Sequence, residues 1–248
     1  MTRIPSAFPR AAFLISLLLI VVGVEAQDSH DIVPRPASVH FTSGFFSLAD
    51  TVSGEVLRSV VDSSSGPAES YSLSVTPSCI SITAADSAGL FYAGQTLSFL
   101  VDRTAGVIPC VEIRDEPRFR WRGFMQDVSR HFFSIEYLKR QIDAMARLKL
   151  NVLHLHLTDA AGWRVEIDRY PLLTSFAAWR EGALWKDWWF GERKYLPEGT
   201  PGAYGGYYTK EELRELVQYA AERCITIVPE IEMPSHSEEV LTAYPELS

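Results

Sequence analysis

Ionisable residues gather at three places along the chain, each at the end of a short apolar run. These places read Asp127-Val128-Ser129-Arg130-His131, Leu157-Thr158-Asp159 and Glu230-Ile231-Glu232-Met233-Pro234-Ser235-His236. Carboxylates and imidazoles exchange protons, and a guanidinium binds oxygen atoms through its planar fork of donors. The pattern therefore predicts a site for acid–base chemistry, for the binding of a polar ligand, or for both.

Arg130, Asp159 and His236 are the leading candidates, and each has a structural alternative. Arg130 could hold substrate hydroxyls or a carboxylate, or it could form a salt bridge with Asp127. Asp159 could orient a second group of the site or bind substrate, or it could stabilise the turn that follows it. His236 could share a proton with such a carboxylate, or lie on the surface at the start of a helix.

Two pairs of ionisable residues are spaced two apart, which places each pair on one face of a strand. Glu230 and Glu232 could form an acid pair, or they could pair with arginine. His154 and His156, together with His236, could ligate one metal ion, or they could be packed, hydrogen-bonded histidines. Because the His-x-His spacing alone is a weak signal, we expect no metal.

The elements that position these residues alternate between strand and helix. The expected strands are Arg122–Val128, Asn151–Leu157 and Ile225–Ile231. Ser134 is the expected N-cap of a helix that runs to about Lys149, and Thr209 with Glu212 matches the capping box of another. The apolar stripe of this second helix is Leu213, Leu216, Val217 and Ala220. A last helical segment starts near Ser237. Such repetition is typical of βαβ units, in which the carboxyl ends of the strands form the site.

A long insert, Asp159–Tyr208, lies between the second strand and the second helix and is rich in Trp, Gly and Pro. Its tryptophans include Trp179, Trp185, Trp188 and Trp189. Aromatic rings of this kind could stack on sugar faces, although most tryptophans in loops anchor the loop by burial.

The region from about Ile32 to Ile113 has a different texture, of short strands and turns. Ser72–Val75 and Ile80–Thr83 alternate with period two, and Gly89–Leu100 has the pattern of a covering helix. We expect a small α+β domain with a structural role. The expected domains are a signal peptide (1–26), an α+β accessory domain (27–115) and a barrel-type domain (116–248).

The N-terminus reads as a secretory signal, with an uncleaved anchor as the alternative. Arg3 and Arg10 precede the uncharged stretch Ala11–Val24, which is shorter than the roughly 20 residues that span a bilayer. Cleavage is expected after Ala26. In an oxidising compartment Cys79 and Cys110 could pair, and Cys224 is expected to be a buried thiol.

Composition excludes several classes of protein. The chain has 248 residues, 47% of them hydrophobic, and a formal charge of −8, which excludes wholesale disorder and a basic footprint for nucleic acid. A closed barrel of eight βα units takes about 250 residues, whereas Arg118–Ser248 provides about three strands. The expected fold is an incomplete (β/α)8 TIM barrel preceded by the α+β domain, either as a small open sheet or as the front part of a longer protein.

Several segments together carry a resemblance to a known family. In the barrel-type region they are Trp121–Phe133, Lys149–Trp163, Gly205–Thr209 and Ile227–Ser237. In the preceding region they are Ile32–Pro36, Gly94–Leu97 and Ile113–Phe119. The chain closely resembles family 20 glycoside hydrolases, the β-N-acetylhexosaminidases, over nearly all of its length after the signal peptide.

The resemblance implies an exo-acting hydrolase that removes terminal N-acetylglucosamine or N-acetylgalactosamine with retention of configuration. The acetamido oxygen of the substrate is the nucleophile, and a glutamic acid protonates the leaving oxygen. Arg130 matches the arginine that grips hydroxyls of the terminal sugar. Asp159 and His236 match the pair that supports the catalytic acid. No cofactor is implied. The implied partners are N-acetylhexosamine-terminated oligosaccharides or glycoconjugates, not nucleic acid or membrane, and the full-length protein could form a homodimer.

The chain also departs from the family pattern. Its only Asp-Glu dipeptide, Asp115-Glu116, precedes the first barrel strand and does not match the catalytic pair. Ser235 replaces a glycine and would be strained if that position needs positive φ. Glu232 occupies a position where the family usually has an aspartate. Ala160 replaces a second aspartate that is common after the one at Asp159. We therefore expect this chain alone to be inactive.

Two alternatives to the hydrolase remain open. One is a non-catalytic secreted protein that binds sugars or other partners, and the other is a metal-dependent barrel hydrolase. The expected localisation is the secretory pathway, ending outside the cell or in a lysosome.

Overall fold

The computed structural model describes residues 31–49 and 57–248. The expected signal peptide lies outside the described residues. Within the described ranges, the helices are all too short or too polar to cross a bilayer. The chain forms two compact units, one reaching to Arg120 and including Arg147–Lys149, the other comprising Trp121–Ala146 and Leu150–Ser248.

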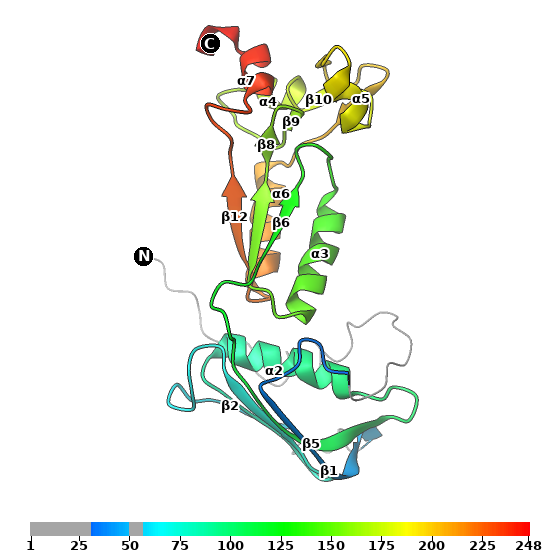
Figure 1. The fold of residues 1–248 in the computed structure, drawn as a ribbon, viewed down its shortest axis with the longest axis vertical. Coiled ribbons are helices and arrows are strands. Elements are labelled where there is room, and N and C mark those ends of the chain that lie inside the picture. Colours follow the sequence, from blue (N-terminus) through cyan, green and yellow to red (C-terminus); the bar gives the residue numbers. More distant parts are fainter. Residues whose placement is uncertain (1–30, 50–56) are drawn as a thin grey trace. The chain divides into compact units, whose positions relative to one another are not determined.

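The first unit is a five-stranded sheet with a helix on one face (Figure 1). Its strands are β1 (Ser38–Ser47), β2 (Leu57–Val61), β3 (Tyr71–Val75), β4 (Ile80–Ala84) and β5 (Val107–Asp115). The order is β1-β5-β3-β4-β2, in which β2 runs parallel to β4 and the other neighbours are antiparallel. Helix α2 (Ser87–Leu100) packs against β3 and β4. The small α+β architecture expected from the sequence is confirmed.

Local sequence explains these elements. Alternate residues of β3 and β4 are buried, as the period-two pattern predicts. Helix α2 begins where the carboxylate of Asp86 accepts a hydrogen bond from the backbone N of Gly89 at 2.8 Å. The segment Asp62–Pro67 is a loop, in which the Asp62 carboxylate accepts a hydrogen bond from the backbone N of Ser64.

The cysteine expectations are not met. Cys79 and Cys110 are free thiols, and the Cys79 thiol lies 3.6 Å from the carbonyl oxygen of Ile80. Cys224 is half-buried instead of buried, and it has a left-handed φ of 59° in the turn after a helix. The buried residue at that turn is the next one, Ile225.

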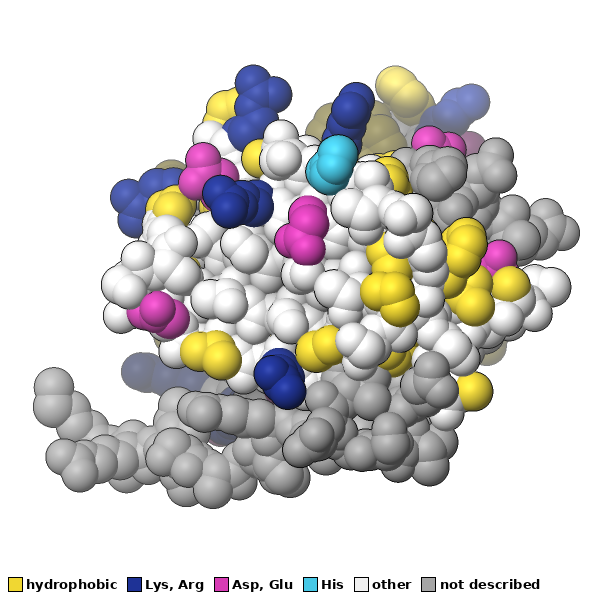
Figure 2. Space-filling model, turned by 90° about the horizontal axis from the view of Figure 1, so that it is seen from below, with side chains coloured by type: hydrophobic (Ala, Val, Ile, Leu, Met, Phe, Trp, Pro, Cys, Tyr) yellow, Lys and Arg dark blue, Asp and Glu magenta, His cyan; other side chains and the backbone are white. Residues whose placement is uncertain are grey.

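Figure 2 shows one face of the molecule, on which basic and acidic side chains are interspersed among uncharged atoms. Together with the net charge of −8, this mixed surface gives phosphate groups no continuous basic stripe on that face.

The second unit contains a three-stranded parallel sheet in the order β12-β7-β6. Its strands are β6 (Gly123–Asp127), β7 (Val152–His156) and β12 (Thr226–Glu230). They confirm the three predicted strands. In the register, His156 lies opposite Asp127 on one side and Glu230 on the other. The three strands therefore end at the same register position, and His156 lies between Asp127 and Glu230 on the neighbouring strands.

The connecting helices are α3 (Ile135–Arg147) and α6 (Lys210–Ala221). The apolar residues of α3 that recur at helical spacing, Ile135, Leu138, Ile142 and Met145, are buried. Helix α6 packs against β12, and its capping box is confirmed: Thr209 accepts a hydrogen bond from Glu212 N, and the Glu212 carboxylate accepts one from Thr209 N. The predicted stripe of α6 is only partly correct, because Leu216 and Ala220 are buried whereas Val217 is exposed.

The insert lies above the carboxyl ends of the strands (Figure 1). Its elements are β8 (Thr158–Asp159), β9 (Gly162–Trp163), α4 (Leu172–Ser175), β10 (Trp179–Glu181), α5 (Trp185–Phe190) and β11 (Ala203–Gly205). Helix α7 (Glu238–Ala243) and the short 3-10 helix η2 (Pro245–Leu247) follow β12. One apolar cluster joins Trp163 and Leu173 to Val240 of α7, and another joins Ala161 to Trp188 and Tyr195. The insert is therefore packed structure that frames the strand ends.

Candidate active site

Asp159 is the centre of the site that forms at the strand ends. It ends the short strand β8, three residues after the end of β7, and is buried. Its Oδ2 atom lies 2.5 Å from Nη2 of Arg130 and 3.4 Å from Nε2 of His156, and its Oδ1 atom lies 3.2 Å from Nδ1 of His236. The three residues predicted to act together, Arg130, Asp159 and His236, are thus brought into one ion-pair network.

The electrostatics of Asp159 favour the ionised form. Burial by itself would raise the pKa of this carboxyl. Hydrogen bonds from His156 and His236 and the charge of Arg130 outweigh that penalty, so the pKa is lowered from its ordinary value. Asp159 is therefore a fixed negative charge against which the neighbouring cations are oriented.

Arg130 forms the salt bridge with Asp127 that the sequence suggested, and it also forms an ion pair with Asp159. Its Nη1 atom bonds to Oδ2 of Asp127 at 3.0 Å and lies 3.3 Å from Nδ1 of His156, while Nη2 binds Asp159. The Asp127 carboxylate also accepts hydrogen bonds from the backbone N atoms of Ser129 and Arg130. The loop after β6 is thereby folded around the guanidinium, which is held with about a third of its side chain exposed.

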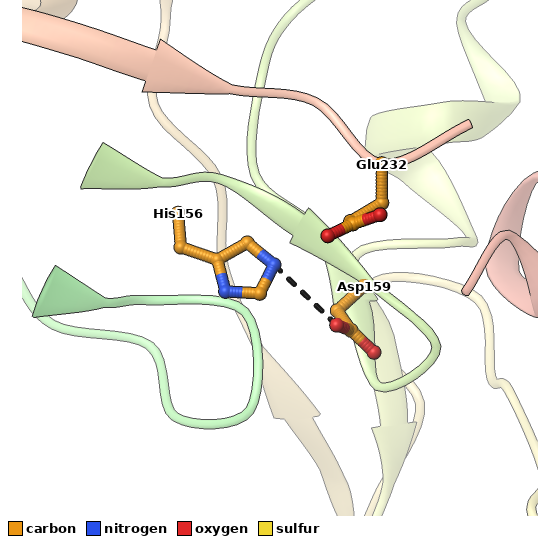
Figure 3. Close-up of side chains that lie close together, drawn as sticks. All are labelled: His156, Asp159 and Glu232. Atoms are coloured by element: carbon orange, nitrogen blue, oxygen red, sulfur yellow. Dashed lines mark ion pairs between the residues drawn. The ribbon is translucent and has the colours of Figure 1, made fainter. Parts of the chain in front are cut away.

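His156 has a larger role than the metal hypothesis gave it. The ring is buried, and Figure 3 shows it pointing at Asp159. Its hydrogen bond to Asp159 raises its pKa, with help from the nearby charges of Asp127 and Glu230 and against the effect of burial. The available signal was the period-two spacing from His154, which places both imidazoles on the strand face that carries Glu230.

His236 reaches the site from the loop after β12. Its backbone is in the left-handed region, with φ of 56°, and about half of its ring is exposed. Ser235 is not among the described residues with positive φ, so the strain expected at this serine falls on the histidine that follows it. The Ser237 hydroxyl donates to the carbonyl oxygens of Glu232 and Ser235, which closes the turn.

Among the described residues, neither Glu230 nor Glu232 forms an ion pair with an arginine. The Oε2 atom of Glu230 lies 2.6 Å from Nε2 of His154. Glu232 lies beyond the end of β12, where its carboxylate is near His156 and Asp159 (Figure 3). Strand β12 ends at Glu230, so Glu232 does not lie on the strand face that was predicted to carry both glutamates.

The three-histidine metal set, which the sequence left open as an alternative, is not assembled, because His154 pairs with Glu230. Among the described residues, the group with metal-ligand spacing is His156, Asp159 and Glu232, whose ligand atoms lie within 4.8 Å of one another. The Asp159 oxygen in this group already faces the guanidinium of Arg130. A cation would have to displace that positive charge, so these residues fit an ion-pair network better than a metal centre.

Arg164 supports the site and was missed by the sequence analysis. It is fully buried and donates to four carbonyl oxygens, those of Val128, Ser129, Ala178 and Gly206. Burial lowers its pKa to about 10, which leaves it charged at neutral pH. It therefore ties the loop that carries Arg130 to the insert. An arginine inside a Trp- and Gly-rich insert gives no periodic signal of this role.

Glu239 in the first turn of α7 was also missed. Its side chain is fully buried, and neither carboxylate oxygen has a hydrogen-bond partner in the described part of the chain. Burial, with the negative charges of Asp159 and Glu238, raises its pKa to about 8. The carboxyl is therefore mostly neutral at pH 7, one turn away from His236.

The dipeptide Asp115-Glu116 has no place in this network. The Oδ2 atom of Asp115 accepts hydrogen bonds from Nζ of Lys149 at 2.7 Å and from the hydroxyl of Tyr71 at 3.0 Å, all within the first compact unit. Its role there is structural, as the family pattern implied.

A parallel sheet whose strand ends carry a shared set of ionisable side chains is typical of α/β enzymes, the TIM barrels among them. Residues 119–248 match the family model described as "Glycosyl hydrolase family 20, catalytic domain". Residues 51–116 match the family model described as "Glycosyl hydrolase family 20, domain 2". The chain belongs to glycosyl hydrolase family 20, and the resemblance seen in the sequence is confirmed.

Similar proteins agree with this assignment. A β-hexosaminidase of Akkermansia muciniphila is 39% identical over 93% of this chain and 43% of its own length. A β-N-acetylhexosaminidase of Cellulomonas fimi is 38% identical over 93% of this chain and 42% of its own. The solved exo-β-N-acetylglucosaminidase of Vibrio harveyi, bound to N-acetylglucosamine, superposes with a TM-score of 0.74 at 29% identity, over 91% of this chain and 40% of that one. The chain thus spans less than half the length of these relatives.

Proposed function

We propose that the whole protein is an exo-β-N-acetylhexosaminidase that removes terminal N-acetylglucosamine or N-acetylgalactosamine from glycans. The observation that carries this proposal is the buried Asp159 carboxylate shared by Arg130 and His236 at the strand ends. The relatives named above, which are β-hexosaminidases, support the same reaction.

In the proposed reaction the acetamido oxygen of the substrate attacks the anomeric carbon while a carboxylic acid protonates the leaving oxygen. Arg130, fixed by two carboxylates, donates to hydroxyls of the terminal sugar with its remaining N–H groups. Asp159 stays ionised and holds the ring of His236, about half of which remains exposed, so that the ring can orient the catalytic acid that the resemblance implies. Arg130 therefore acts by binding the terminal sugar, and Asp159 and His236 act by orienting the catalytic acid.

The test uses the purified whole protein and methyl N-acetyl-β-D-glucosaminide, with release of N-acetylglucosamine as the readout. Arg130→Lys keeps the charge but removes the planar fork, so kcat/KM should fall about 100-fold. Arg214→Lys is the matched control, because Arg214 pairs with Glu211 on the exposed face of α6. Wild-type activity in Arg130→Lys would remove the proposed role of this residue.

The same preparation separates the hydrolase from a non-catalytic sugar-binding protein. Calorimetric binding of N-acetylglucosamine without product release from the methyl glycoside would favour the binding protein and overturn the hydrolase.

We also propose that the protein enters the secretory pathway. The basic start and short apolar run before Ala26 support this proposal. N-terminal sequencing of the exported protein should begin near Gln27, whereas a protein that retains residues 1–26 in the membrane fraction would contradict it.

A further inference from the structure

Glu239 is a buried acidic residue that the proposed reaction leaves without a role. It stands in the first turn of α7, where its neighbour Glu238 is exposed and forms a 3.0 Å ion pair with Arg193. The side chain of Glu239 is instead fully buried. Two adjacent glutamates therefore have opposite environments, and only Glu238 keeps the solvation that an ionised carboxylate needs.

The surroundings of Glu239 favour a neutral carboxyl. Neither of its oxygens has a hydrogen-bond partner among the described residues. The Arg164 guanidinium nearby is already committed to four carbonyl oxygens, and a second negative charge beside Asp159 would be repelled. Burial is the largest cause of its raised pKa of about 8, so the carboxyl holds a proton at neutral pH. The titratable and charged groups that act on Glu239 or respond to its charge are Asp159, Arg164, Tyr195 and Glu238.

Helix α7 rests on the insert at the turn that contains Glu239. The helix packs beside β9 and α4 (Figure 1), and Val240 joins the apolar cluster of the insert. Burial, and then the nearby charge of Glu239, raises the pKa of the Tyr195 phenol. The hydroxyl of Tyr195 donates to the carbonyl oxygen of Ala160, the residue after Asp159. Glu239 is therefore enclosed between α7 and the turn that carries the central carboxylate.

A displacement of this first turn of α7 would move His236. His236 stands three residues before Glu239, and the Ser237 hydroxyl between them donates to two carbonyl oxygens of the loop, so little slack separates the loop from the helix. The Nδ1 atom of His236 lies 3.2 Å from Oδ1 of Asp159. This distance is already long for a hydrogen bond, so a shift of about half an ångström would break it.

We propose that Glu239 is a positioning residue of the hydrolytic site. Its neutral carboxyl seats the first turn of α7 against the insert and so holds His236 within reach of Asp159, and ionisation of Glu239 releases that turn and disengages His236. An ionised carboxylate is too costly to keep unpaired in the interior, so it turns toward water and takes the start of α7 with it. The proposal rests on the proposed function for the reaction that His236 and Asp159 serve.

Glu239→Gln tests the proposal, because it keeps the shape of the side chain and cannot ionise. The ratio of its kcat/KM to that of the wild type, measured on the whole protein with methyl N-acetyl-β-D-glucosaminide, cancels every group that titrates alike in both. The ratio should be nearly constant below about pH 7 and rise about tenfold by pH 9, since a group with a pKa of about 8 is then mostly ionised.

Glu246→Gln, on the exposed 3-10 helix, is the matched control, and its ratio to the wild type should stay flat over the same range. A flat ratio for Glu239→Gln as well would overturn the proposal. Far-UV circular dichroism of the wild type at pH 9 should show a folded chain, and unfolding of the whole chain there would overturn a local displacement of α7.

NMR of the His236 ring separates this proposal from the proposed function. In the wild type the ring resonances should show a step with a midpoint near pH 8 that is missing in Glu239→Gln. This step in a protein that cleaves no glycoside would support the positioning role and overturn the hydrolase. Cleavage of the glycoside, with the same His236 titration in wild type and Glu239→Gln, would keep the hydrolase and overturn the positioning role.

Discussion

The Nη2 atom of Arg130 lies 2.5 Å from Oδ2 of Asp159, so the group proposed to bind sugar hydroxyls is held by the group proposed to orient the catalytic machinery. The first follows β6 and the second follows β7 in the parallel sheet. Each compensates the charge of the other in a site where an unpaired buried carboxylate would be costly. Substitution of either residue should therefore disturb both substrate binding and catalysis.

Asp159→Asn tests the central charge directly. Since the hydrogen bond to Asp159 is the largest cause of the raised pKa of His156, the variant should lower that pKa. Titration of the His156 ring by NMR measures the change. An unchanged His156 titration would show that another group holds the imidazolium.

The same pair predicts how stability depends on pH. A raised pKa in folded His156 gives stability that is complete below the ordinary value of 6.5 and is lost as pH rises through the folded value. In Asp159→Asn this loss should be smaller. Urea unfolding between pH 5 and about 9 measures it, and identical curves for wild type and variant would contradict the assignment.

Arg164→Met should destabilise the second compact unit by about 3 kcal/mol or more, because it leaves four buried carbonyl oxygens without their donor. Thermal unfolding measures the loss. Arg214→Met is the control, since the exposed Arg214 should change stability by less than about 0.5 kcal/mol. Equal stability of the two variants would mean that the buried carbonyls find other donors.

Glu239→Gln should stabilise the protein at alkaline pH. The folded pKa of about 8 lies above the ordinary 4.5, so the wild type loses stability as pH rises from about 4.5 through 8. The glutamine cannot ionise, and its advantage should grow over that range to the order of a few kcal/mol and vanish near pH 4.

Urea unfolding of Glu239→Gln and wild type at several pH values tests this prediction, with Glu246→Gln on the exposed 3-10 helix as the control. Parallel pH profiles for wild type and Glu239→Gln would show that the carboxyl is not buried in the neutral form.

Thr209→Ala should remove both side-chain bonds of the Thr209 hydroxyl at the start of α6 and cost about 1 kcal/mol. Thr209→Ser keeps the hydroxyl and should stay near wild-type stability. Chemical denaturation compares the two. A loss of the same size in both variants would assign the effect to the methyl group and not to the cap.

The sequence by itself determined the local elements and the place of the site. Alternation with period two identified β3 and β4, and the Thr209–Glu212 spacing identified the cap of α6. These signals are legible because they depend on residues a few positions apart. The candidates Arg130, Asp159 and His236 followed from their position after predicted strands.

Only the tertiary structure decided which partners these groups have. His154 turns to Glu230, while His156 joins Asp159, although both histidines share one strand face in the sequence pattern. Arg164 and Glu239 are buried among segments far from them in the chain. Hydrogen bonds and desolvation depend on ångström-scale distances between such distant segments, and no local periodicity encodes those distances.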